Sequence, residues 1–171
     1  VRQFVFMSSI KVNGEQSSIA ADGRPHRFSA DDPPQPTTAY GRSKWEAEQV
    51  LRQTLGDTGT RLTVLRPPLV YGPGQKANLH ALMRAVDKRL PLPLASIKNR
   101  RSLIDVDNLA DALVIAMTSR LNSTTYTLAD VDVSIATLVE AMASALGRRS
   151  NLIRCPQALL ELVATICGRR A

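Results

Sequence analysis

The stretch QFVFMSS, residues 3–9, sets the fold class of this chain. A short apolar run bounded by polar residues is typical of a strand buried on both faces of a parallel sheet. The stretch RLTVLRPP, residues 61–68, repeats the pattern and predicts a second buried strand over residues 62–65, which the two prolines end. A helix is predicted between them, over residues 37–55, so the chain alternates strand and helix.

The rest of the chain continues this alternation, which predicts an α/β protein with a mostly parallel sheet. We expect strands at residues 100–106, 125–129 and 151–155, and helices at residues 79–88, 109–119, 135–147 and 157–167. Asp107 or Asn108 is expected to cap the helix at 109–119, and Ser134 the helix that follows it. Residues 13–36 are expected to form a loop, and loops of this length inside compact domains are usually functional.

The composition of the chain limits the classes of protein to which it can belong. The chain has 171 residues, 44% of them hydrophobic and 22% charged, which is enough material for a core, and no apolar run is long enough for a membrane helix. Two cysteines, Cys155 and Cys167, form no CxxC pair and no histidines cluster, so we expect no metal site and no disulfide framework, as in a reducing cytoplasm. The net charge of +7 lies in scattered pairs and aromatics are 4%, which favours a solvated surface over a nucleic-acid interface.

The predicted helix in TTAYGRSKWEAEQ, residues 37–49, carries a candidate site. Thr37 or Thr38 can cap it, and Tyr40 and Lys44 lie four residues apart, on one helical face. A phenol ionises near pH ~10, so proton exchange with an alcohol near neutral pH needs roughly 4 kcal/mol of preferential phenolate stabilisation, and an adjacent ammonium supplies part of it. Ser9 ends the strand at 3–9, where α/β sheets bind ligands. The structural alternative is a half-buried tyrosine beside a surface lysine, with serines that only end a strand.

Four segments, in order along the chain, resemble the extended short-chain dehydrogenases/reductases, specifically the nucleotide-sugar epimerase/dehydratase family. They are FVFMSSIKVNGE, YGRSK, LRPPLVYGPG and RRSLIDVDNLADAL, and the resemblance spans roughly residues 3–130. It implies a partial Rossmann-like fold with a small substrate-binding region. Residues 1–75 are expected to be the C-terminal part of the Rossmann-like domain with the Ser/Tyr/Lys site. Residues 76–171 are expected to be mainly substrate-binding, with interleaved Rossmann elements.

The resemblance also implies roles for single residues. Ser9 would hydrogen-bond the reacting sugar oxygen, Tyr40 would be the general acid/base, and Lys44 would hold the nicotinamide ribose and favour the ionised phenol. Pro67 to Val70 would line the nicotinamide of NAD or NADP. Two further residues, Asn78 and Arg101, would contact the diphosphate of the nucleotide sugar, since a guanidinium's forked donors suit phosphate oxygens; the alternative for Arg101 is a solvent-facing arginine in a basic turn.

The sequence departs from the family pattern in two ways. Ser8, Ser9 and Ile10 stand where the dehydratases have Thr-Asp-Glu, so dehydration is disfavoured. The resemblance implies a UDP-sugar 4-epimerase, with a 4-ketoreductase of surface-polysaccharide synthesis or a non-catalytic remnant as alternatives. The family's glycine-rich turn between an opening strand and helix does not occur in this sequence. We therefore expect the chain to be the C-terminal part of a longer enzyme, inactive and weak in NAD binding by itself. A homodimer, through the tyrosine helix or through an exposed sheet edge, is also expected.

Overall fold

The computed structural model describes residues 2–16, 26–74, 78–97, 99–119, 121 and 124–156, with Asn78 described by its backbone only. They form two compact units, Val1–Gly72 with Leu103–Asp130, and Pro73–Ser102 with Val131–Ala171. The predicted α/β class with a mostly parallel sheet is confirmed. In chain order the elements are β1 (Gln3–Met7), the 3-10 turn η1 (Ile10–Val12), α1 (Ala39–Gly56), β2 (Arg61–Arg66), β3 (Leu69–Tyr71), α2 (Asn78–Asp87), β4 (Arg100–Asp105), α3 (Val106–Thr118), β5 (Thr124–Thr127), β6 (Val131–Ser134) and α4 (Ile135–Ala145).

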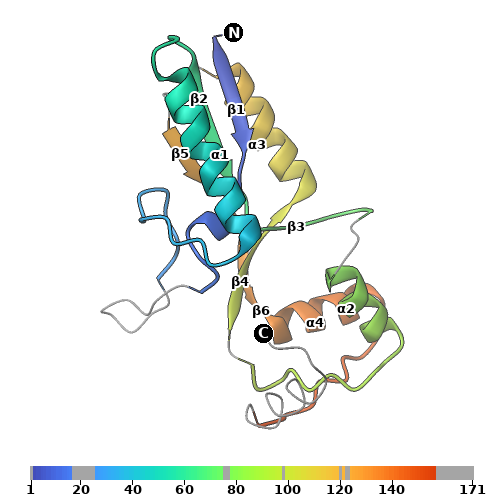
Figure 1. Ribbon diagram of the computed structural model, residues 1–171. Helices are drawn as coiled ribbons and strands as arrows, with labels where there is room; N and C mark the ends of the chain where they lie inside the picture. The colour runs from blue at the N-terminus through green and yellow to red at the C-terminus, as the bar shows by residue number, and fades with distance from the viewer. Residues whose placement is uncertain are drawn as a thin grey trace. The chain divides into compact units, whose positions relative to one another are not determined.

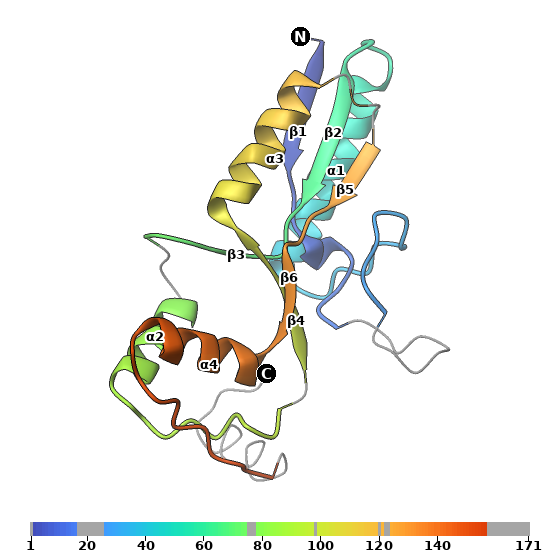
Figure 2. The ribbon, with the colours of Figure 1, turned by 180° about the vertical axis from the view of Figure 1, so that it is seen from behind.

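The first unit is built on the parallel sheet β1-β2-β5 (Figure 1). Phe4 pairs with Leu62 and Leu65 with Tyr126, so all three strands end at the same edge. Helix α1 covers one face of this sheet and α3 covers the other, as the two opposite views show (Figures 1 and 2). Because β2 is covered on both faces, Val64 and Leu65 are buried, as the apolar run predicts.

A short parallel pair extends the first unit beyond the ends of these strands. Leu69–Tyr71 of β3 pair with the last three residues of β4. Gly72 follows with φ +150°, and a Cβ there would lie 2.4 Å from Val106 Cγ1 at the start of α3. Only glycine allows both this backbone conformation and this close approach.

The second unit has its core between α2 and α4, which pack side by side (Figure 2). Val86 contributes from α2, and Val139 and Ala143 contribute from α4. Ser134 caps α4 as predicted, because its Oγ accepts from Thr137 N at 3.0 Å. Beside this core, the first residues of β4 lie near β6, where Ser102 Oγ donates to Asp132 Oδ1.

Three local features of the structure differ from the sequence predictions. Helix α3 begins at Val106, and its cap is Asp105 instead of Asp107 or Asn108, since Asp105 Oδ1 accepts from Asp107 N at 2.8 Å. Residues 151–155 form no strand; they make a single bridge, Leu92 to Leu152. Strands β3 and β6 are additional. β3 has only three residues and directly follows two prolines, and β6 alternates apolar and polar residues without an apolar run. The expected helix at 157–167 lies outside the described residues.

Candidate functional site

The candidate site lies at the carboxyl ends of β1 and β2, against the first turns of α1. Thr38 caps α1, as its extended backbone lets its Oγ1 accept from Gly41 N at 3.1 Å. Gly41 permits the helix to approach η1 closely, because a Cβ at this position would lie 2.6 Å from the carbonyl oxygen of Lys11. The cap and the close approach together fix where Tyr40 stands.

Lys44 and Tyr40 lie on the same face of α1, as the four-residue spacing predicts. The Lys44 ammonium donates to the carbonyl oxygen of Met7 at 3.0 Å, and it lies 5.9 Å from the centre of the Tyr40 ring and 5.1 Å from the centre of the Phe6 ring. Tyr40 is 53% exposed, so a ligand can reach its hydroxyl. The arrangement places a fixed positive charge beside an accessible phenol at the end of β1.

Ser9 stands just beyond β1, at the start of η1. Its Oγ accepts from Lys11 N at 3.3 Å, and the residue is 8% exposed. The backbone on both sides is anchored to the end of β2, because Ser8 N donates to Leu65 O at 2.7 Å and Ile10 N donates to Pro67 O at 3.0 Å. Ser9 is therefore held at the same sheet edge as the Lys44 ammonium.

The remaining predicted residues divide between the two units. Pro67 is buried and accepts from Ile10 N, and Val70 is half-buried in β3, where it pairs with Ile104. Arg101 is exposed on the first part of β4 in the second unit. Asn78 opens α2 in that unit, and its side chain lies outside those described. The structure thus brings Ser9, Tyr40, Lys44 and Pro67 to one sheet edge, and it describes Asn78 and Arg101 separately from them.

Sequence reasoning missed a buried ion pair under this edge. Glu48 on α1 is fully buried, and Arg66 at the end of β2 is 2% exposed. Arg66 Nη2 donates to Glu48 Oε2 at 2.7 Å, and Arg66 Nε donates to Glu48 Oε1 at 3.0 Å. The sequence offers only a partial signal, since Glu48 follows Lys44 by four residues on the helical stripe and Arg66 ends an apolar strand, but nothing local pairs the two residues.

Two neighbouring side chains form further hydrogen bonds with this ion pair. Ser8 Oγ donates to Glu48 Oε1 at 2.6 Å, and Arg66 Nη1 donates to Asn13 Oδ1 at 3.1 Å. Ser8 and Asn13 are both 3% exposed. Buried charges are tolerated when they are paired and fully hydrogen-bonded, which is the case for this carboxylate.

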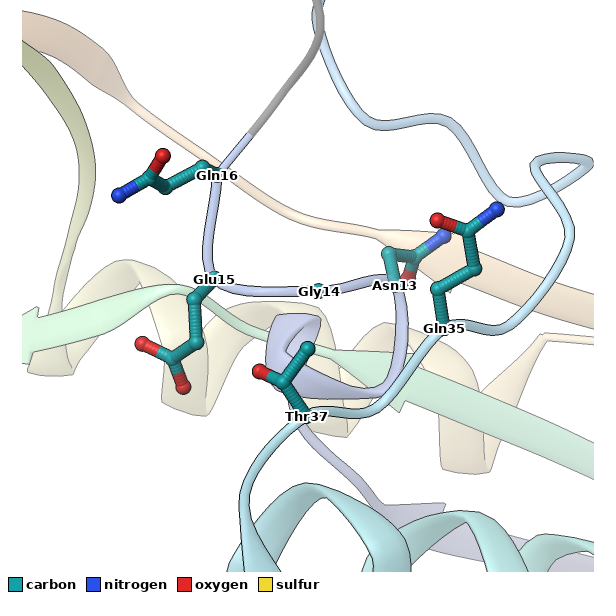
Figure 3. Close-up of a pocket in the computed structure, with 6 residues that line it drawn as sticks. All are labelled: Asn13, Gly14, Glu15, Gln16, Gln35 and Thr37. Carbon is teal, nitrogen blue, oxygen red and sulfur yellow. The ribbon is translucent and has the colours of Figure 1, made fainter.

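A pocket of about 330 Å³ opens beside the site, on the predicted loop (Figure 3). Its lining includes three amides and one carboxylate, from Asn13, Gly14, Glu15, Gln16, Gln35 and Thr37. Figure 3 shows Asn13 and Gln35 at one end of the pocket and Glu15 and Gln16 at the other. None of the predicted site residues lines this pocket.

Acidic groups gather where β3 and β4 end. Asp130 Oδ2 accepts from Asp105 N at 2.7 Å and from Asn108 Nδ2 at 2.9 Å. Burial raises the pKa of the Tyr71 phenol above its ordinary value, and the nearby charges of Asp105 and Asp130 raise this pKa further. Tyr71 is thus kept protonated, which makes it unlike a proton-exchanging tyrosine.

Comparisons with known proteins identify the family of this chain. The model of the NAD dependent epimerase/dehydratase family matches residues 1–129. This chain belongs to that family. A UDP-glucose 4-epimerase of Vibrio cholerae is 38% identical over 172 residues, which cover 99% of this chain and 51% of the relative. The chain therefore spans about half the length of this curated relative.

Solved structures of the family share the fold. MoeE5 in complex with UDP-glucose and NAD is 26% identical, with a TM-score of 0.72 over 91% of this chain and 52% of that one. A UDP-glucuronic acid 4-epimerase from Bacillus cereus in complex with NAD is 21% identical, with a TM-score of 0.73 over 89% of this chain and 50% of that one. The latter likeness shows the fold alone. In the part of the chain that the structure describes, no helix has the length and apolar character to cross a membrane.

Proposed function

We propose that this chain is the catalytic and substrate-binding part of an NAD-dependent UDP-sugar 4-epimerase. One observation carries the proposal: the Lys44 ammonium is held by Met7 O next to the accessible phenol of Tyr40, at the sheet edge that also carries Ser9. The relative in Vibrio cholerae, a UDP-glucose 4-epimerase similar over 99% of this chain, supports the choice of reaction.

In the proposed mechanism the chain's own side chains handle the proton at the sugar C4 oxygen. Tyr40, as phenolate, accepts the proton of the C4 hydroxyl, and later returns it to the oxygen. Ser9 hydrogen-bonds the same oxygen and holds it in reach of the phenol. Lys44 stabilises the phenolate by its charge. NAD, when bound, supplies the hydride acceptor and then the donor at C4.

The residues present fit the nicotinamide end of NAD. An ammonium has three N–H donors, and among the described residues Lys44 gives one to Met7 O, so that two suit the adjacent hydroxyl groups of a ribose. Pro67 and Val70 would offer the apolar surface for the ring. Asn78 and Arg101 are proposed to bind the diphosphate of the nucleotide sugar, for which the exposed guanidinium of Arg101 provides forked donors.

Elimination of water does not fit this site. It needs an acid and a base beside the sugar, and the segment at the end of β1 offers Ser9 and Ile10 in the corresponding places. Reduction of a 4-keto sugar uses the same three residues. An epimerase interconverts UDP-glucose and UDP-galactose with catalytic NAD, whereas a reductase consumes one reduced nicotinamide per sugar, so the stoichiometry separates these two reactions.

Substitution of Tyr40 tests the proposal in the natural gene product. Tyr40→Phe is expected to lower the turnover of UDP-sugar epimerisation by about 100-fold or more while UDP binding stays the same, because only proton transfer is lost. Tyr126→Phe removes a phenol from β5 and is the matched control, with turnover unchanged. Equal turnover in Tyr40→Phe and the wild type would refute the assignment.

We also propose that the protein is cytoplasmic and that this chain by itself associates with further copies. Among the described strands β1 pairs with β2 alone, so its other edge has free backbone donors and acceptors for another strand. Light scattering after gel filtration is expected to show a mass of at least two copies at micromolar concentration. A monomer at all concentrations would contradict this.

A further inference from the structure

We propose that the buried pair of Glu48 and Arg66 is a positioning device for Ser9, which it holds in place from both sides; this rests on the proposed function. The pair does not contact Ser9. It reaches the two flanking residues instead, since Ser8 Oγ donates to Glu48 Oε1 at 2.6 Å and Asn13 Oδ1 accepts from Arg66 Nη1 at 3.1 Å. The segment of residues 8–13, which carries Ser9, is therefore tied down at each end by one half of the same ion pair.

The ion pair also joins this segment to the helix that bears the general base. Tyr40, Lys44 and Glu48 follow one another at four-residue intervals on a single stripe of α1. Along that stripe the phenol is 53% exposed and the carboxylate is fully buried. One rigid helix thus presents Tyr40 to the ligand at one end of the stripe and, two turns further on, holds the Ser9 segment through Ser8.

The network extends one step further, into the loop. Asn13 Nδ2 donates to Ser29 O at 3.0 Å, so that Asn13 bridges Arg66 and the part of the loop that precedes α1. The amide nitrogen and the amide oxygen of Asn13 each have a partner within the protein, which fits a positioning role. A displacement of about 1 Å in the reacting groups is enough to slow an enzymatic reaction by about 100-fold, so small movements of this segment matter.

The positioning role is tested by a substitution that removes the Ser8 hydroxyl and leaves both members of the ion pair in place. Ser8→Ala is compared with Ser8→Thr, which retains a hydroxyl, and with Thr63→Val, which removes a buried hydroxyl of β2 that has no partner among the described residues. The first readout is amide hydrogen exchange in the natural gene product at Ile10, Val12 and Asn13, whose N–H groups are hydrogen-bonded. The second is kcat and KM for UDP-sugar epimerisation.

We expect Ser8→Ala to speed exchange at these three amides by about tenfold while exchange in α3 stays constant, and to lower kcat by about tenfold with KM within twofold. Ser8→Thr restores both values, and Thr63→Val leaves both unchanged. A general loss of stability would instead speed exchange in α3 as well, and this result would overturn the proposal, as would unchanged exchange at all three amides.

A second variant covers the case in which Ser8→Ala does not fold. Asn13→Ala releases the other end of the segment, and the same local increase in exchange at Ile10 and Val12 is expected. The exchange measurement needs no turnover, so failure of the proposed function and failure of the positioning role give different results. If the wild type does not epimerise UDP-sugars but the variants show the expected local increase in exchange, only the proposed function is refuted. If the wild type epimerises UDP-sugars and exchange in the variants is unaltered, only the positioning role is refuted.

Discussion

The Lys44 ammonium lies 5.9 Å from the centre of the Tyr40 ring, one turn further along the same face of α1. The ammonium is not free to move, because it also donates to Met7 O at 3.0 Å. In the proposed mechanism this charge is already in place beside the reacting phenol, so it does not have to reorganise during the reaction.

Replacement of Lys44 should therefore affect turnover more than nucleotide-sugar binding. Lys44→Met is expected to lower kcat for epimerisation by about 100-fold, since the phenolate loses its cation and a ribose loses two donors. Lys88→Met removes the same charge from an exposed position beyond α2 and should leave kcat unchanged. Steady-state kinetics with UDP-galactose, together with UDP binding by calorimetry, distinguish the two effects. Similar kcat values for both variants would contradict the assigned role.

The ion pair of Glu48 and Arg66 should dominate the stability of the first unit. Glu48→Gln or Arg66→Met leaves one buried charge without its partner, which costs about 3–5 kcal/mol of unfolding free energy. Arg52 provides the matched control: its Nη2 lies 3.5 Å from Glu48 Oε2, but its side chain is 39% exposed, so Arg52→Met should cost at most about 1 kcal/mol.

Urea unfolding measures these differences, and the single tryptophan provides the signal. Trp45 lies with its ring centre 5.9 Å from Arg66 Cζ, so its fluorescence reports on the pair directly. Equal losses for Arg52→Met and Arg66→Met would show that burial of the guanidinium is unimportant. The double variant, Glu48→Gln with Arg66→Met, should cost less than the sum of these two single changes, because no charge is left unpaired.

An element of this fold could be predicted from the sequence where it depends on contacts between neighbouring residues in the chain. Local signals suffice for β1, β2 and α1, because apolar runs and a threonine cap are properties of neighbouring residues. The same holds for the shared face of Tyr40 and Lys44. Strand β3 directly follows two prolines and has three residues, so nothing local distinguishes it from a loop.

The ion pair shows why the rest escapes prediction. Glutamate and arginine are almost never fully buried unless they are paired, so each of them alone is expected to face solvent. Glu48 and Arg66 are eighteen positions apart and on different elements, and only packing of α1 on β2 brings them together. The cap of α3 is a smaller case: Asp105, Asp107 and Asn108 are all good capping residues, and the end of β4 decides among them.

Because α1 packs closely on η1, substitution of Gly41 should lower the stability of the protein. Gly41→Ala is expected to lower the unfolding free energy by about 1–3 kcal/mol, because the new Cβ would lie 2.6 Å from Lys11 O and backbone must shift. Gly56→Ala, at the last residue of the same helix, meets nothing within 4 Å and should be neutral or stabilising by up to about 1 kcal/mol. Urea unfolding of both variants measures this contrast, and an equal effect of the two substitutions would contradict it.

The stability of the loop before α1 should depend on the protonation of Asp32, and therefore on pH. The backbone N–H of Ser29 donates to Asp32 Oδ2 at 2.8 Å, and this bond, followed by the one to His26, lowers the pKa of the Asp32 carboxyl below 3.8. The folded state thus favours the carboxylate. Its stabilisation is present above about pH 3.8, the value of the unfolded chain, and is lost as the pH falls through the lower folded pKa.

Asp32→Asn should remove this pH dependence. In the wild type the amide signal of Ser29 is expected to shift in an NMR titration with a midpoint below pH 3.8, as its acceptor is protonated. The variant should lack this shift and exchange the Ser29 amide faster at pH 5. Asp31→Asn, at the exposed neighbouring position, is the control and should leave the titration of Ser29 as it is. A midpoint above pH 3.8 would mean that burial outweighs the two hydrogen bonds.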